Sequence, residues 1–404
     1  MKPTTSHGNR NARSLSGDQA LLRRLNRTAL IRLVWQEPGI SRSEVALRLG
    51  LTKSSIGQVA QELILEGWLG AGESSTGSNP GRPSIPLSIN RERFALIGVE
   101  LDVNRLNAVA IDPYGSRLSS RTRSGDFRNL KFTLENIAEM VGELQSCAAV
   151  AGRNVLGLGI GAPGPVDLER ELLTYAPNMP WENIPLQRLI AEHLPQIPSS
   201  NIFVDNDANL AALSEYMFGL HRNSGDLLFV HLAYGIGGGI VKDHEIYRGA
   251  HGFAGEIGHI SVLLNGPKCS CGSQGCAETL FSVHALEREM LEAGYPIDFA
   301  ELLERVKVSD PIALRVVRRA AAYLGVYLVN LANTLDPEVI VVGGLVAELG
   351  EAILEPARRE MQRRMFGLRH RTVNVVTGQY RLDACAMGAA GYVWLKLLET
   401  TELD

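Results

Sequence analysis

Three of the five cysteines in this 404-residue chain lie close together, in the segment AGEIGHISVLLNGPKCSCGSQGCAE (254–278). Cys269, Cys271 and Cys276 fall within eight positions, and His259 precedes the first by ten residues. Three thiolates and one imidazole complete a tetrahedral zinc shell, which leaves no open position for a catalytic water. We therefore expect a structural zinc ion. The alternative is a group of ordinary buried thiols, which the clustering with glycines and a histidine disfavours.

Two glutamates accompany these residues, Glu256 before His259 and Glu278 after Cys276. A carboxylate fixed on a rigid loop is a good acceptor for sugar hydroxyls, because bidentate acceptor geometry helps when it is preorganised. The alternative is that both are solvated loop acids, the usual place of glutamate.

The segments GEIGH and CSCGSQGCAE resemble the signature of the ROK family (repressor, open reading frame, kinase). Within that family, the chain resembles the xylose and N-acetylglucosamine repressors. The match extends over most of residues 96–390. The resemblance implies zinc on His259, Cys269, Cys271 and Cys276, with Glu256, His259 and Glu278 facing a sugar. It also implies a two-lobed, actin-like (ribonuclease-H-like) domain.

The composition is that of an ordinary soluble protein, with 45% hydrophobic residues, 21% charged residues and a formal net charge of -4. No apolar run approaches the ~18 residues that span a bilayer, and the start lacks a signal-peptide hydrophobic region. We expect a cytoplasmic protein without a membrane partner. Residues 1–90 hold 11 Lys and Arg against 6 Asp and Glu, which is +5, so the remainder carries -9. This basic N-terminal part is weak evidence for a nucleic-acid partner.

Residues 1–19 are polar and predict a flexible tail, and residues 20–90 predict a winged helix-turn-helix domain. A first helix covers the apolar pattern from Leu21 to Val34. Ser41 caps a second helix that ends near Arg48, and Thr52 caps a third. On the third helix one buried stripe is expected at Ile56, Val59, Ala60 and Leu63.

The residues outside this stripe are short, amide or cationic side chains that can bond to phosphates and base edges. A glycine- and proline-rich stretch after the third helix predicts a wing with an arginine near its tip. The predicted DNA contacts are Ser41, Arg42, Thr52, Lys53, Ser54, Ser55, Gln58 and Arg82. The alternative is a three-helix packing module whose polar face contacts water.

Residues 93–404 alternate strand-like runs with helical patterns, which predicts an α/β domain. Asn206 and Asp207 follow the strand at Ile202, and ligands of such sheets bind at the carboxyl ends of strands. Asp207 can accept a hydrogen bond from a substrate hydroxyl or take its proton, or it can simply cap the next helix. The resemblance implies the functional role, and it adds Asn206 and Gly164 to the sugar side. For Gly164 a plain Pro-Gly turn is the alternative.

The resemblance also implies where a kinase would hold ATP, at an acidic residue followed by a Gly-Gly-Thr turn. This chain has Glu100-Leu101-Asp102-Val103-Asn104 there, so side chains and a negative charge replace the glycines. A second loop keeps its glycines at 235 and 237–239, but Tyr234 stands where the kinases carry threonine. A glycine run also has a plain structural explanation as a tight strand connection. The prediction is that the chain is not an enzyme.

These patterns together predict a sugar-responsive DNA-binding regulator of carbohydrate genes, acting as a repressor. Asp207 would then be a fixed hydroxyl acceptor. The resemblance implies a homodimer or tetramer on double-stranded operator DNA, and the apolar helices near 314–331 and 384–398 are candidates for packing or an interface. Two alternatives remain open. One is a bifunctional ATP-dependent sugar kinase with Asp207 as the catalytic base, and the other is a DNA-binding protein without an effector.

Overall fold

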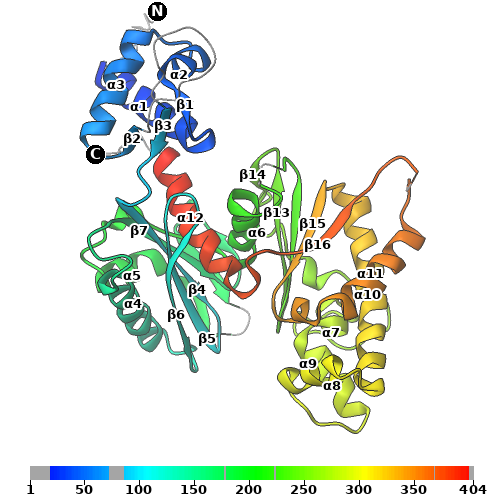
Figure 1. Cartoon of the computed structure of the whole chain (residues 1–404). Coiled ribbons are helices and arrows are strands. Elements are labelled where there is room, and N and C mark those ends of the chain that lie inside the picture. Colours follow the sequence, from blue (N-terminus) through cyan, green and yellow to red (C-terminus); the bar gives the residue numbers. More distant parts are fainter. Residues whose placement is uncertain (1–18, 72–85, 177–178, 223, 368, 400–404) are drawn as a thin grey trace, which may run out of the picture. The chain divides into compact units, whose positions relative to one another are not determined.

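The computed structural model describes residues 19–71, 86–176, 179–222, 224–367 and 369–399. The chain forms two compact units, which we describe one at a time (Figure 1). The first runs to Asn90 and includes the chain end from Lys396, and the second runs from Arg91 to Leu395. None of the helices in the described part of the chain is both long and apolar enough to cross a bilayer.

The first unit is a three-helix module with a small antiparallel sheet. Its helices are α1 (Gln19–Gln36), α2 (Arg42–Arg48) and α3 (Lys53–Leu65), and its strands are β1 (Ile40–Ser41), β2 (Leu69–Ala71) and β3 (Pro86–Ile89), in the order β1-β3-β2. The expected wing is the β2–β3 pair, in which Leu69 lies opposite Ile89. Arg82 at the predicted wing tip and the predicted tail up to residue 18 lie outside the described residues.

Local chemistry sets both helix starts of the helix-turn-helix. The Ser41 hydroxyl accepts the Glu44 N–H at 3.2 Å while the Glu44 carboxylate accepts the Ser41 N–H at 3.0 Å, a complete capping box. The Thr52 hydroxyl accepts the Ser55 N–H at 3.1 Å. The buried residues of α3 are the four predicted ones, Ile56, Val59, Ala60 and Leu63. The sequence prediction for these two helices is confirmed.

The second unit holds two five-stranded sheets. The first sheet has the order β11-β7-β4-β5-β6, from β4 (Phe94–Leu101), β5 (Arg105–Ile111), β6 (Arg117–Ser124), β7 (Asn154–Ala162) and β11 (Ile202–Asn206). The second has the order β14-β13-β12-β15-β16, from β12 (Leu227–Leu232), β13 (Ile236–Lys242), β14 (Glu245–Ile246), β15 (Val339–Gly343) and β16 (Asn374–Thr377). In each sheet three strands are parallel and the others pair antiparallel. This repeated pattern is the two-lobed α/β organisation that was expected.

Helices cover both sheets and bury two separate apolar cores. They are α4 (Leu130–Ser146), α5 (Leu186–His193), α6 (Asp207–Phe218), α7 (Glu278–Phe281), α8 (Val283–Glu292), α9 (Phe299–Lys307), α10 (Pro311–Leu335), α11 (Glu351–Arg364) and α12 (Ala384–Glu399). Short 3-10 turns are η1 (Ser199–Asn201), η2 (Ile257–His259), η3 (Leu345–Leu349) and η4 (Arg381–Asp383), and a small third sheet holds β8 (Val166–Asp167), β9 (Leu172–Ala176) and β10 (Trp181–Ile184).

Helix α12 begins at the first sheet, and glycines on that sheet let it come close. A Cβ at Gly98 would lie 2.0 Å from the Ala386 carbonyl oxygen, and one at Gly159 would lie 1.9 Å from that of Ala389. The far end of α12 belongs to the first unit, where Arg32 Nη2 donates to the Leu398 carbonyl at 2.8 Å. The sequence had assigned this end to the second domain.

Candidate ligand cavity, metal centre and nucleic-acid interface

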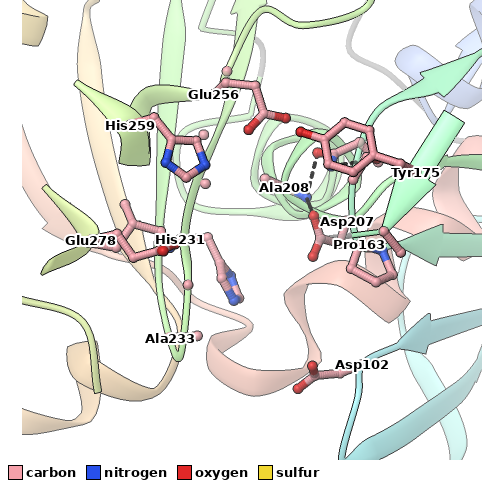
Figure 2. A pocket seen from close by; sticks show the side chains of 18 of the residues that line it. Asp102, Pro163, Tyr175, Asp207, Ala208, His231, Ala233, Glu256, His259 and Glu278 are labelled. Carbon is pink, nitrogen blue, oxygen red and sulfur yellow. Dashed lines mark hydrogen bonds between the residues drawn. The ribbon is translucent and has the colours of Figure 1, made fainter. Parts of the chain in front are cut away.

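A cavity of about 620 Å³ opens in the second unit, and all six residues predicted to face a sugar line it (Figure 2). They come from the ends of β7 and β11, from η2 and from the start of α7. The six are Gly164, Asn206, Asp207, Glu256, His259 and Glu278. Segments separated by more than 100 positions in the sequence thus meet around one space of the size that small ligands occupy.

Asn206, and not Asp207, caps α6 through its side chain in the way that was considered as the alternative role of Asp207. The Asn206 side-chain oxygen accepts the N–H groups of Ala208 and Asn209 at 3.0 and 3.1 Å and so caps α6, while its amide donates to the Gly164 carbonyl at 3.1 Å. Asp207 accepts one backbone N–H, that of Ala208, at 2.7 Å, and its carboxylate is directed into the cavity. Burial, with the charges of Asp102 and Glu256 adding, raises the pKa of Asp207 to about 7.

The four predicted metal ligands converge on one point beside the cavity. The ligand atoms of His259, Cys269, Cys271 and Cys276 all lie within 4.8 Å of one another. His259 Nδ1 is 3.6 Å from Cys269 Sγ, and Cys271 Sγ is 3.7 Å from Cys276 Sγ. Zn–N and Zn–S bonds of ~2.1 and ~2.3 Å place tetrahedral ligands roughly 3.5–3.8 Å apart, so these four can hold a metal ion of that size.

Glu256 and Glu278 flank this cluster in different ways. The Glu278 carboxylate accepts the Ile236 N–H at 3.1 Å, so it joins the metal-binding segment to the glycine-rich start of β13. Glu256 precedes η2, and Figure 2 shows its carboxylate near the phenol ring of Tyr175 and directed toward the cavity. Burial raises the pKa of Glu256, with His259 opposing the shift and Glu278 adding to it.

A model of the ROK family matches residues 96–395. The chain belongs to the ROK family. A putative xylose repressor from Caldicellulosiruptor sp. (strain Rt8B.4) is 30% identical over 93% of this chain and 97% of its own length. A ROK glucokinase from Streptomyces griseus, solved with glucose and AMPPNP, is 31% identical over 74% of this chain and 98% of its own, with a TM-score of 0.67. A ROK transcriptional regulator described as a homologue of the E. coli MLC protein has a similar fold over 94% of this chain and all of its own, with a TM-score of 0.78 at 24% identity.

The glycine run of this ROK chain has a packing role. A Cβ at Gly239 would lie 2.2 Å from the Ala208 carbonyl oxygen on α6, and a Cβ at Gly238 would lie 2.3 Å from the Ile257 side chain. These contacts are closer than any real Cβ makes, so β13 can approach α6 and η2 only without side chains there. Packing therefore explains the glycines at 238 and 239. It constrains the other two less, because a Cβ at Gly237 would lie 3.3 Å from the Ala208 Cβ and one at Gly235 would lie 3.0 Å from a Glu278 carboxylate oxygen.

The turn after β4 is closed by its own side chains. The Asp102 carboxylate accepts the Val103 N–H at 2.7 Å, and the Val103 side chain is buried in the core of the first sheet. Glu100 is also buried and accepts from Arg105 Nη2 at 2.9 Å. Burial raises the pKa of Glu100 to about 7, against the lowering effect of Arg105.

Several residues of the cavity were not predicted from the sequence. The β9–β10 pair supplies Tyr175, Trp181 and Glu182, and β12 supplies His231. Burial lowers the pKa of His231 to about 4, and the nearby Arg105 adds to the shift, so this imidazole is uncharged near neutral pH. The sequence offered one signal for these residues: Tyr175 and Trp181 flank a Pro-Asn-Met-Pro stretch. Such a stretch is also typical of an ordinary loop, so it did not predict a ligand site.

Seven of the eight predicted DNA-binding residues are described, and they lie at the starts of α2 and α3 and in the second turn of α3. Thr52, Lys53, Ser54 and Gln58 are exposed, and Ser41, Arg42 and Ser55 are half-buried. Ser41 and Thr52 already use their hydroxyl oxygens as helix caps, so each retains a hydroxyl hydrogen as donor. The Gln58 amide donates to Glu62 at 3.3 Å, a bond that an exposed side chain can exchange for a base edge.

Proposed function

We propose that this ROK protein is a sugar-responsive DNA-binding transcriptional regulator, which represses carbohydrate genes. The observation that carries the proposal is the similarity to a putative xylose repressor along 93% of the chain, which includes the helix-turn-helix unit as well as the ROK domain. A helix-turn-helix unit joined to a ligand cavity is the organisation that such a regulator needs.

The cavity residues would bind a sugar by accepting its hydroxyl hydrogens. Asp207, Glu256 and Glu278 supply carboxylate oxygens, and a backbone N–H already holds Asp207 and Glu278 before the ligand arrives. Charged acceptors give stronger hydrogen bonds than neutral ones, and fixed acceptors lose little entropy on binding. Asn206 caps α6 and so fixes the start of the helix that carries Asp207.

The ion held by His259 and the three cysteines would be a structural zinc ion. The donor set of three thiolates and one imidazole is one that zinc prefers, and it fills four positions with protein atoms. The bonds would fix the loop that carries Glu256, His259 and Glu278. With Nδ1 turned to the thiolates, the other ring nitrogen of His259 faces the cavity and can bond to a ligand hydroxyl.

Loss of phosphoryl transfer is part of the proposal, although a solved relative is a glucokinase. The Val103 N–H, which could otherwise approach a phosphate, already donates to Asp102, and the Asp102 charge would repel one. Asp207 would act as an acceptor and not as a base. The kinase alternative predicts ATP turnover that requires Asp207.

The sugar would regulate DNA binding by changing how the two lobes of the ROK domain are arranged. A ligand shifts an equilibrium between two arrangements through its differential affinity for them. In a dimer or tetramer on a palindromic operator, the arrangement would set the spacing of paired helix-turn-helix units, in which α3 enters the major groove.

The test is operator affinity of the full chain at fixed salt, with DNA from its own promoter region and a panel of sugars. A shift in affinity produced by one sugar supports the regulator. Tight binding that no sugar alters supports the effector-independent alternative, and sugar-dependent ATP turnover that requires Asp207 supports the kinase, whether or not the chain binds DNA.

A further inference from the structure

The charge of the cavity is strongly one-sided. Six carboxyl groups line it, Glu100, Asp102, Glu182, Asp207, Glu256 and Glu278, and near neutral pH two of them, Glu100 and Asp207, carry part of a charge because burial raises their pKa to about 7. Among the described residues that line it there is no lysine or arginine, and the histidines present are His231, which burial keeps uncharged, and the metal ligand His259. A divalent ion with three thiolates carries a net charge of -1, so an occupied metal centre adds no positive charge.

The arginine beside Glu100 and the arginine beside the end of β11 are already paired. Arg105 Nη2 lies 2.9 Å from Glu100, and Arg248 Nε donates to Asp205 at 3.1 Å. Charge-assisted pairs of this kind hold their partners, so neither guanidinium is available for an incoming anion without breaking a bond to a buried carboxylate.

Several backbone donors beside the cavity are also in use. A helix N-terminus is the natural anion site of such a fold, but at the start of α6 the Ala208 N–H donates to Asn206 and Asp207 and the Asn209 N–H donates to Asn206. At the two turns beside the cavity, the Val103 N–H donates to Asp102 and the Ile236 N–H donates to Glu278. At these three places an acceptor of the protein's own already takes the backbone N–H groups that a phosphate could use.

We propose that the effector is an uncharged, unphosphorylated sugar, that the cavity rejects sugar phosphates, and that Asp102 is the residue that sets this rejection. The inference rests on the proposed sugar-sensing function and names the ligand class. A phosphate ester brings about -1.5 to -2 charges at neutral pH, and like charges face one another across a cavity in which no cation compensates them. Asp102 is the selectivity determinant because its carboxylate also occupies the Val103 N–H, the donor at the β4–β5 turn.

The experiment is calorimetric titration of the full chain with three pairs of probes: glucose and glucose 6-phosphate, N-acetylglucosamine and its 6-phosphate, and xylose and xylose 5-phosphate. For the sugar that binds, its phosphate is expected to bind at least about 100-fold more weakly, since like-charge juxtaposition is strongly unfavourable. A phosphate that binds within tenfold of its parent sugar, or more tightly, overturns the inference and leaves sugar sensing intact. If none of the six probes binds, the proposed function itself fails.

The variant Asp102→Asn tests the assigned residue. Asparagine keeps an oxygen for the Val103 N–H, so the turn is preserved while one negative charge is removed. The ratio of sugar affinity to sugar-phosphate affinity is expected to fall at least about tenfold. Glu139→Gln is the matched control, because Glu139 lies on α4 outside the cavity, pairs with Arg123 at 2.7 Å and has a side chain that is 67% exposed. An Asp102→Asn ratio equal to that of Glu139→Gln would remove Asp102 from the assignment.

Discussion

The substitution Asp207→Asn is expected to stabilise the ligand-free ROK domain near pH 8 and to weaken sugar binding. The Asp207 carboxylate lies among Asp102 and Glu256, and burial raises its pKa from 3.8 to about 7. Asparagine keeps an oxygen for the Ala208 N–H but carries no charge. The ionised Asp207 carboxylate, which is proposed to bind the sugar, therefore lowers the stability of the ligand-free domain.

The magnitude and its pH window follow from linkage. Because the pKa in the folded state is the higher one, the native state holds a proton that the unfolded state has lost, and stability falls as pH rises from about 4 to about 7. A shift of about three pKa units corresponds to roughly 4 kcal/mol. Since the carboxylate borders an open cavity, water screens part of this cost, and we expect a gain of roughly 1–3 kcal/mol for the variant above pH 7 and almost none near pH 4.

Thermal melting of wild type and variant at pH 5, 6, 7 and 8, with and without the sugar that binds, measures both effects. Without ligand the variant should melt a few degrees higher at pH 8, at roughly 2–4 °C per kcal/mol for a domain of this size. With ligand its stabilisation should shrink, because one charged hydrogen bond of about 1.5–3 kcal/mol is lost, which is roughly 10- to 150-fold in Kd.

Glu100→Gln is the control for charge removal alone. Burial raises the pKa of Glu100 to about 7 against the lowering effect of Arg105, so neutralising Glu100 should also raise the melting temperature above pH 7. Sugar affinity should stay near that of wild type, because Glu100 is not among the residues proposed to bind the sugar. The reasoning is refuted if Asp207→Asn melts at or below the wild-type temperature throughout the pH range, or if it binds the sugar as tightly as wild type.

Three further predictions concern the metal centre, the DNA contact and the glycine run. Cys276→Ser should lose bound zinc, measured by metal analysis, and with it the sugar response; a normal response without metal would contradict the structural role. Lys53→Ala should weaken operator binding and reduce the salt slope by about 1, whereas Gln58→Ala should cost about 1–3 kcal/mol on the specific site and little on random DNA. Gly239→Ala should destabilise the ROK domain by about 1–3 kcal/mol in melting experiments, because its Cβ would meet a backbone oxygen of α6. Gly142→Ala, on α4 with open space around it, should be neutral or stabilising by up to about 1 kcal/mol, and equal effects of the two would contradict the packing argument.

The sequence predicted most of the DNA-binding unit because its determinants are local. Ser41 and Glu44 are three residues apart and form a capping box wherever a helix starts between them, and the α3 stripe repeats at helical spacing. The His/Cys cluster that could hold a metal ion was equally predictable, since His259 to Cys276 span one short segment.

Contacts between distant segments were not readable in the same way. The hydrogen bond from the Ile236 N–H to Glu278 joins positions 42 residues apart, and neither residue type predicts it. Tyr175 and Trp181 line the cavity because β9 and β10 pair antiparallel, with Ala176 opposite Trp181, beside a sheet whose order is fixed by crossover connections. Such placement depends on tertiary topology, and a single sequence carries no signal for it.

The packing of the glycine run bears on how motifs are interpreted in related chains. Gly238 and Gly239 must stay small for β13 to lie against η2 and α6, whatever the cavity binds. Selection for a stable domain would therefore preserve these two glycines, which resemble part of a nucleotide-binding loop, even in a protein that does not transfer phosphate. A search that counts these two glycines therefore cannot separate kinases from regulators of this fold. Under the proposed function, the residues at 102 and 103 are the positions that distinguish them.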